Sequence, residues 1–192
     1  QTRDIFVEAA TSVNAEVVAL LQAHGVNAVG LTDQIAIQGN RKDSIRAVVD
    51  GRIRIVRDDY SGTITNVNPN AILDILAAGG VPVIPPLAAS PDGLLNIDGD
   101  RGAAAVAAAL GADDMVILSN VRGLYRNFGD ENSFVNQVNR QQITTALDWA
   151  QGRMKRKVIG AQEALNGGVR RVTIADGRTA SPNQLARELD LP

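Results

Sequence analysis

Apolar and polar residues alternate along this chain with two periods, one typical of helices and the other of strands. Four apolar residues at helical spacing predict a first helix: Val13, Val17, Leu20 and Leu21. Ser12 is a candidate N-cap for this helix, and Gly25 is a stop signal after it. Residues 26–31 follow as a short buried strand. Residues 1–10 already have the pattern of a helix interior, so we expect the sequence to begin inside an element.

A β-hairpin is predicted over residues 45–56. The dipeptide Asp50-Gly51 favours a tight turn and lies between two arms rich in β-branched residues. In the second arm arginine alternates with isoleucine at residues 52–55, and side chains alternate between the two faces of a strand. We therefore expect one packed face and one basic face.

The remaining segments alternate between helices and strands. Helices are predicted over residues 69–78, 99–110, 143–150 and 153–165, with a last short one after Ser181-Pro182, and strands over residues 81–84, 114–118 and 171–174. This order implies a mainly parallel α/β sheet with the hairpin as an antiparallel addition. No internal repeat or long linker interrupts it, so we expect one contiguous domain over residues 1–192.

Composition narrows the classes of protein. The 192 residues are 45% hydrophobic and 21% charged, with a net charge of −2, which is typical of a globular protein and argues against general coating of nucleic acid. The lack of cysteine excludes disulfides, thiolate metal sites and cysteine nucleophiles, and His24 alone cannot form a multi-histidine site. No apolar run approaches the length of a membrane span and no secretory signal opens the chain, so we expect a cytoplasmic protein.

Three polar segments are candidates for chemistry. In the first, Asn96, Asp98 and Asp100 share one face of an extended segment, opposite Leu95 and Ile97, just before a helix. Ligands favour the carboxyl ends of strands in such sheets. The alternative is that Asp98 caps the helix and that Asp100 interacts with its dipole.

The second segment opens the helix predicted over residues 153–165. Four residues form its apolar stripe: Met154, Val158, Ala161 and Leu165. Arg156 lies on the opposite side, whereas Lys157 lies at the edge of the stripe, where its ammonium can extend into solvent or into a cleft. Cations at a helix start oppose the helix dipole, a cost that bound phosphate would relieve.

The third segment, residues 118–125, is a polar turn that follows a strand and contains Gly123. It is compatible with an ordinary turn and with backbone N–H groups that face a ligand. In this order, the three segments resemble the amino acid kinase family and, within it, the acetylglutamate kinase branch. Residues 152–158, Pro85-Pro86 and residues 60–63 resemble most closely the members that act on α-aminoadipate attached to the amino-group carrier protein LysW.

The resemblance implies a three-layer αβα fold with a mainly parallel central sheet, in which residues 1–90 belong to an acceptor-substrate lobe and residues 91–192 to a nucleotide-binding lobe. It implies phosphorylation of a side-chain carboxylate by ATP with Mg²⁺, in lysine biosynthesis. Lys157 would stabilise the transferring phosphoryl group, Asp100 would orient Lys157 and a second lysine, and Asn96 would bind the substrate. The residues expected to hold the nucleotide are Asn120, Val121, Arg122, Gly123, Leu124, Tyr125, Gln151 and Gly152.

Alternatives remain open at this stage. The acceptor could be N-acetylglutamate of arginine biosynthesis. The family's Lys-Gly-Gly loop, its second glycine loop and its substrate-binding arginine have no counterpart here, so the chain is either part of a longer kinase, which we expect, or a catalytically silent binding module. An Asp-x-Asp phosphatase is a more distant alternative.

The expected partners follow from the same resemblance. Carriers of the LysW type are acidic, and a basic cluster could steer such a partner: Arg41, Lys42, Arg52, Arg54 and Arg57. A solvated hairpin face explains the same residues equally well. Relatives are commonly dimers or larger, so we expect a homo-oligomer.

Overall fold

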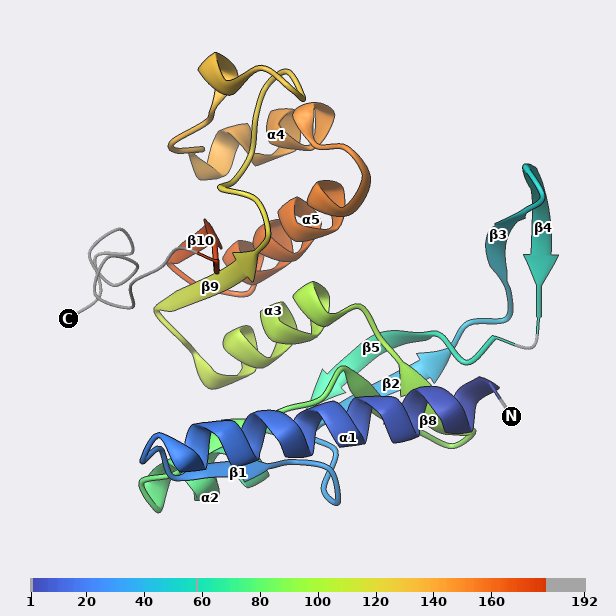
Figure 1. Ribbon diagram of the computed structural model, residues 1–192, viewed down its shortest axis with the longest axis vertical. Helices are drawn as coiled ribbons and strands as arrows, with labels where there is room; N and C mark the ends of the chain where they lie inside the picture. Colours follow the sequence, from blue (N-terminus) through green and yellow to red (C-terminus); the bar gives the residue numbers. More distant parts are fainter. Residues whose placement is uncertain (1, 58, 179–192) are drawn as a thin grey trace. The chain divides into compact units, whose positions relative to one another are not determined.

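The structure is a computed structural model and describes residues 2–57 and 59–178 (Figure 1). It comprises two compact units, Gln1–Gly102 and Ala103–Pro192. The boundary falls inside α3 (Gly99–Leu110), the alanine-rich helix. The lobes expected for residues 1–90 and 91–192 stay a prediction, and so does the short helix after Ser181-Pro182, which lies outside the described residues.

The first unit opens with a single long helix, α1 (Thr2–Ala23), which contacts the parallel strands β1 (Ala28–Gly30) and β6 (Val81–Val83). α2 (Asn70–Ala77) also contacts β6 and lies within the helix predicted over residues 69–78. Because α1 runs unbroken through residue 12, the prediction that Ser12 caps a helix is wrong.

The inner face of α1 also differs from the predicted stripe. Val13, Val17 and Leu20 are exposed, whereas Asn14 is buried. The Asn14 side-chain N–H donates to the Val83 carbonyl at 2.9 Å, which satisfies a buried polar group and ties α1 to β6. The buried face of α1 thus contains a hydrogen-bonded polar residue. Hydrophobicity alone therefore does not predict which face of this helix is buried.

A four-stranded mixed sheet forms the rest of the core of this unit, in the order β5-β2-β7-β8. β2 (Ile37–Arg41) is antiparallel to β5 (Gly62–Val67) and parallel to β7 (Leu87–Ser90), and β7 is antiparallel to β8 (Gly93–Asn96). Side chains on this sheet fill the interior, among them Ile37, Leu87 and Leu95. The last residues of β8 lead directly into α3, so the sheet positions the first candidate segment.

The predicted hairpin is present as β3 (Ile45–Val49) and β4 (Arg52–Val56), which pair antiparallel. Asp50 and Gly51 have φ values of 51° and 72°, as a two-residue hairpin turn with the right twist requires. Figure 1 shows the hairpin projecting from the other strands and helices of its unit. The prediction of a packed face is wrong, since Ile53 and Ile55 are exposed.

The second unit is built on the parallel pair β9 (Asp114–Ser119) and β10 (Arg171–Asp176), with α5 (Gly152–Asn166) packed on β10. Small residues of α3 and α5 meet Met115 and Ile117 of β9 in one core. α4 (Ile143–Trp149) packs on α5, and the connection from β9 includes the 3₁₀ turns η1 (Glu131–Ser133) and η2 (Arg140–Gln142). These elements confirm the predicted α/β class. Within residues 2–57 and 59–178, no helix has the length and apolar character needed to cross a bilayer.

Burial of Leu95 supplies a direct test of this core. Its side chain is 0% exposed, so Leu95→Ala should lower the free energy of unfolding by about 2–5 kcal/mol through lost apolar burial and a residual cavity. Leu73→Ala is a matched control, because Leu73 is 46% exposed and its truncation should cost less than about 1 kcal/mol. Urea unfolding followed by circular dichroism measures both. Equal losses for the two variants would contradict the packing described.

Candidate functional site

The first candidate segment joins β8 to α3. Leu95 and Ile97 are buried and the alternate residues Asn96 and Asp98 are partly exposed, as the period of an extended strand predicts. The Asp98 carboxylate accepts a hydrogen bond from the Arg101 backbone N–H at 3.2 Å, so Asp98 does cap α3. The helix begins at Gly99, so Asp100 lies in its first turn. The expectation that Asp100 shares an extended face with Asn96 is therefore wrong.

Asn96 is held by the segment that follows the hairpin. Its backbone N–H donates to the Tyr60 carbonyl at 2.9 Å, and Ser61 forms an isolated parallel bridge with it. The Tyr60 ring lies 4.9 Å from the Arg3 guanidinium and 4.2 Å from that of Arg41. Such cation–π contacts restrain the ring. The 60–63 motif noted in the sequence therefore has a structural role next to the predicted substrate-binding residue.

The second segment opens α5, where the predicted apolar stripe is confirmed. Val158 and Ala161 are buried, and Met154 and Leu165 are partly buried. Arg156 is exposed, as are the other cations that precede it in the helix, whereas Lys157 is partly buried. Lys157 thus lies at the boundary between core and solvent. At such a position an ammonium group can bind an anion without the full free-energy cost of removing the ammonium from water.

The two residues predicted to act together belong to different units: Asp100 to the first and Lys157 to the second. Neither Asp100 nor Lys157 is without an interaction. Their pairing in catalysis stays a prediction.

The third segment leaves β9 as a turn that is packed on one side. Asn120, Val121 and Arg122 are exposed, whereas Gly123 and Leu124 are buried. A Cβ at position 123 would lie 3.1 Å from the Phe134 ring, so the close packing of that ring favours glycine there. Packing against Phe134 thus explains Gly123, whereas residues 120–122 are open to solvent.

Phe134 organises this turn and has no signature in the sequence. The Arg122 guanidinium lies over its ring at 4.3 Å, and the Tyr125 ring meets it edge-on with 5.3 Å between centroids. These contacts hold the predicted nucleotide residues on either side of Gly123. Sequence reasoning missed Phe134 because a lone aromatic in a polar loop carries no pattern.

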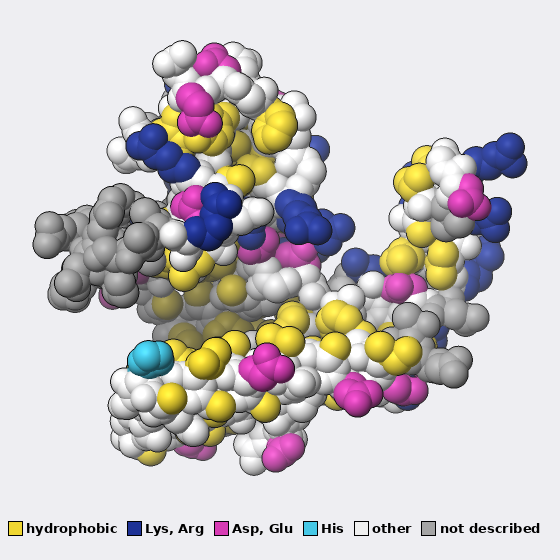
Figure 2. Space-filling view, viewed as in Figure 1, with side chains coloured by type: hydrophobic (Ala, Val, Ile, Leu, Met, Phe, Trp, Pro, Cys, Tyr) yellow, Lys and Arg dark blue, Asp and Glu magenta, His cyan; other side chains and the backbone are white. Residues whose placement is uncertain are grey.

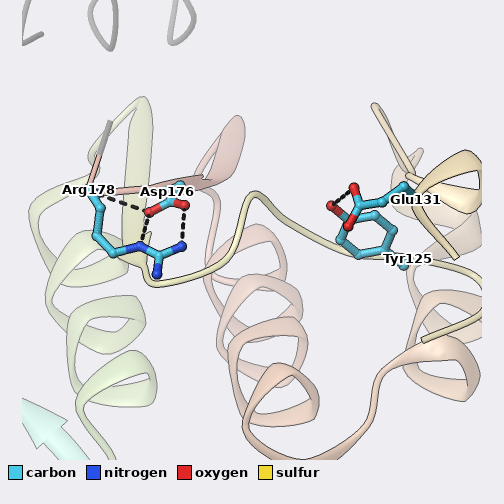
Figure 3. A network of polar contacts seen from close by, with 4 residues as sticks. All are labelled: Tyr125, Glu131, Asp176 and Arg178. Carbon is cyan, nitrogen blue, oxygen red and sulfur yellow. Dashed lines mark hydrogen bonds and ion pairs between the residues drawn. The ribbon is translucent and has the colours of Figure 1, made fainter. Parts of the chain in front are cut away.

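Two polar pairs flank the turn (Figure 3). The Tyr125 hydroxyl donates to Glu131 at 2.9 Å, and because this bond stabilises the protonated phenol, it raises the pKa of Tyr125. Asp176 accepts two guanidinium hydrogen bonds from Arg178, at 2.9 and 2.7 Å, and its pKa falls to about 2. Asp176 therefore stays ionised, with its charge paired, throughout the neutral range.

Asp176 and Ser119 end neighbouring parallel strands and face each other in register. The Gly177 N–H donates to the Ser119 carbonyl at 2.9 Å, so the two strands finish at a common edge. Carboxyl ends of parallel strands are the usual position for ligands in α/β sheets. Gln151 and Gly152, the other predicted nucleotide residues, are exposed at the start of α5.

A cavity of about 760 Å³ lies within the second unit. Gly123 and Leu124 line it, together with apolar residues of α5 and the amides of Asn136, Gln137 and Asn139. Its lining does not include Asn120, Gln151 or Gly152, so the predicted nucleotide residues divide between this cavity and open surface. Among the described residues, no three His, Asp or Glu side chains gather in an arrangement suited to a metal ion.

Several known proteins are similar to this chain in sequence or in fold. The model of the amino acid kinase family matches residues 1–176. The chain is 44% identical to "[LysW]-aminoadipate kinase" of Deinococcus radiodurans over 95% of its length, and 45% identical to the protein of that name from Thermus thermophilus over 88%. It is 36% identical over 88% of its length to "Acetylglutamate kinase" of Saccharopolyspora erythraea. The chain spans 64%, 65% and 55% of these three relatives.

Solved structures agree on the architecture. N-acetylglutamate synthase from Neisseria gonorrhoeae, complexed with coenzyme A and N-acetyl-glutamate, is 27% identical with a TM-score of 0.74, over 94% of this chain and 39% of that one. Carbamate kinase from Giardia lamblia bound to AMP-PNP is 16% identical with a TM-score of 0.61, over 91% and 69%, a likeness of fold alone. Together with the family match over residues 1–176, the three ordered segments lead to one conclusion. The chain belongs to the amino acid kinase family.

Proposed function

We propose that the protein transfers the γ-phosphoryl group of ATP to a side-chain carboxylate and so forms an acyl phosphate. The observation that carries the proposal is the identity of 44–45% with two proteins named [LysW]-aminoadipate kinase. The three candidate segments occur in the same order as the family's motifs, and each lies at a strand or helix end in the structure.

The chemistry is a displacement at phosphorus. A carboxylate oxygen forms a bond to the γ-phosphorus, the bond from that phosphorus to the β–γ bridging oxygen breaks, and ADP leaves with the electron pair. A carboxylate needs no general base, so catalysis rests on positioning and on cancelling charge between two anions. Mg²⁺ bound to the phosphates would neutralise part of this charge.

Lys157 supplies the protein's own cation in this proposal. Its position at the edge of the α5 core restricts the side chain more than a fully exposed lysine is restricted. Asp100, in the first turn of α3, acts as a positioning residue that orients the ammonium. The turn over residues 120–125 and the start of α5 hold the nucleotide.

The acceptor in this proposal is α-aminoadipate attached to the carrier protein LysW, with Asn96 hydrogen-bonded to it. The names of the relatives support this choice, and so do the basic residues of the 41–57 segment, which suit an acidic carrier. N-acetylglutamate is the second candidate, supported by the identity of 36% with an acetylglutamate kinase.

Loss of the proposed catalytic groups should lower turnover without unfolding the protein. Lys157→Ala in the full-length protein should reduce kcat by about 10²–10³-fold, because it removes electrostatic stabilisation of the transition state. Asp100→Ala should reduce kcat by a similar factor, because the ammonium is then no longer held in position. Hydroxylamine trapping of the acyl phosphate measures the rate. Lys155→Ala, which removes an exposed cation two residues away, should stay within about twofold of wild type. A Lys157→Ala enzyme with near-normal kcat would exclude the role assigned to this lysine.

The acceptor is tested by competition between substrates. With ATP saturating, kcat/KM should be at least about tenfold higher for carrier-attached aminoadipate than for free N-acetylglutamate, since contacts with the carrier add binding energy. The same hydroxamate assay measures both. A preference for N-acetylglutamate would replace the proposed acceptor while leaving the proposed reaction in place.

A further inference from the structure

The Tyr60 ring brings together separate parts of the first unit. The guanidinium groups of Arg3, from α1, and Arg41, from the end of β2, lie over this ring at 4.9 and 4.2 Å from its centroid. Arg3 also donates to the Asp92 carbonyl, in the turn between β7 and β8, at 3.4 Å. All three members of this Arg3–Tyr60–Arg41 cluster are partly buried. Their mutual contacts therefore restrict the ring from more than one element.

Other contacts fix the two arginines. Arg41 donates to the carbonyls of Arg57 and Asp59 at 3.0 and 3.1 Å, and Arg3 forms an ion pair with Asp4 at 2.9 Å. A guanidinium group is planar, so each of these bonds also limits how the group can turn over the ring. The cluster is therefore a set of mutually restrained groups.

The backbone of residues 60–61 lies directly against Asn96, the predicted acceptor-binding residue. The Tyr60 carbonyl accepts the Asn96 backbone N–H at 2.9 Å, and Ser61 forms a parallel bridge with Asn96. On its other edge Asn96 pairs with Leu87 of β7. Asn96 is thus held from both sides, and one of those sides is the segment that the cluster fixes.

The position of Asn96 at the end of β8 makes this contact important. Burial of the flanking Leu95 and Ile97 directs the Asn96 side chain outward. A hydrogen bond between its amide and an acceptor substrate also depends on distance and angle, and it weakens steeply when either departs from the preferred range. Contacts that fix the backbone of Asn96 therefore decide how well its amide meets a ligand.

We infer that Tyr60 is a positioning residue for acceptor binding. The Arg3–Tyr60–Arg41 cluster fixes the peptide group that receives the Asn96 N–H, and so sets the direction in which the Asn96 amide meets the acceptor. The inference rests on the proposed function, because it takes Asn96 to bind the acceptor. The alternative is that the cluster contributes only to folding stability. The two differ in how substitutions of Tyr60 and Asn96 combine.

The test measures steady-state kinetics of the full-length protein with LysW carrying aminoadipate as the acceptor. Tyr60→Leu should raise KM for the acceptor about tenfold, since Asn96 is no longer held in the productive orientation, and leave KM for ATP within about twofold of wild type. Tyr60→Phe keeps the ring that both arginines contact and should restore the wild-type KM. Circular dichroism checks that each variant is folded.

A second variant tests the cluster outside the hairpin. Figure 2 shows Lys and Arg side chains gathered over the projecting hairpin, whereas the coloured side chains on the visible face of α1 are mainly hydrophobic and acidic. Because Arg3 belongs to α1, Arg3→Gln leaves the hairpin charge unchanged. It should raise KM for the acceptor about threefold, and it supplies the same comparison if Tyr60→Leu lowers the folded fraction. The matched control, Asp4→Asn, removes the ion-pair partner of Arg3 but not the ring contact and should leave this KM unchanged.

A double-mutant cycle separates positioning from stability. If Tyr60 acts through Asn96, Tyr60→Leu/Asn96→Ala should have the acceptor KM of Asn96→Ala within about twofold. Calorimetry adds a second measurement: Tyr60→Leu should raise Kd about tenfold for LysW carrying aminoadipate and leave Kd for LysW without aminoadipate unchanged.

The outcomes distinguish this inference from the proposed function. A wild-type acceptor KM in Tyr60→Leu, multiplicative effects in the double variant, or an equal rise in Kd for both forms of LysW would each overturn the positioning role while leaving the proposed reaction in place. A rise in Kd confined to the loaded carrier, in a protein that makes no acyl phosphate from any acceptor, would support the positioning role and overturn the proposed function.

Discussion

Burial of Leu95 and Ile97 is the constraint on which the acceptor half of the candidate site depends. Because side chains alternate along an extended segment, fixing these two inside the core directs Asn96 and Asp98 outward. A Cβ at position 62 would lie 3.0 Å from Leu95 and 3.3 Å from Ile97, so the start of β5, next to the Ser61 bridge to Asn96, approaches these side chains closely because Gly62 has no side chain. The packing that anchors the end of β8 thereby also sets where its polar groups point and where α3 begins.

The second unit handles charge in a different way. Its exposed cations lie at the start of α5, where the helix dipole makes them unfavourable without an anion, whereas the carboxylate at the end of β10 is paired with Arg178. The edge formed by the ends of β9 and β10 therefore presents a neutralised acid rather than a bare negative charge. Both features arise from residues close together in sequence.

Elements with clear turn signals or clear helix start and stop signals could be predicted from the sequence. The Asp50-Gly51 turn predicted the hairpin correctly. The helix predicted over residues 69–78 agrees with α2, and the alternation of residues 95–98 agrees with the end of β8. The orientation of α1 could not be predicted, because its inner face contains Asn14, whose partner is 69 residues away. β2, β5 and β7 were also missed, since their identity as strands depends on pairing with distant segments. The candidate site shows the same division. Motifs selected Asn96, Lys157 and the 120–125 turn as candidates, whereas the role of Phe134 emerges only from tertiary contacts, and no motif singled out the local Asp176–Arg178 pair.

The exposure of Val48, Ile53 and Ile55 on the hairpin has an evolutionary consequence. Residues that support no core are free to change without loss of folding, so substitutions in this ribbon are filtered by what they bind rather than by what they stabilise. These three positions can therefore vary more freely than the buried residues of β2 and β7. The catalytic scaffold would meanwhile remain under the stricter selection that a packed interior imposes.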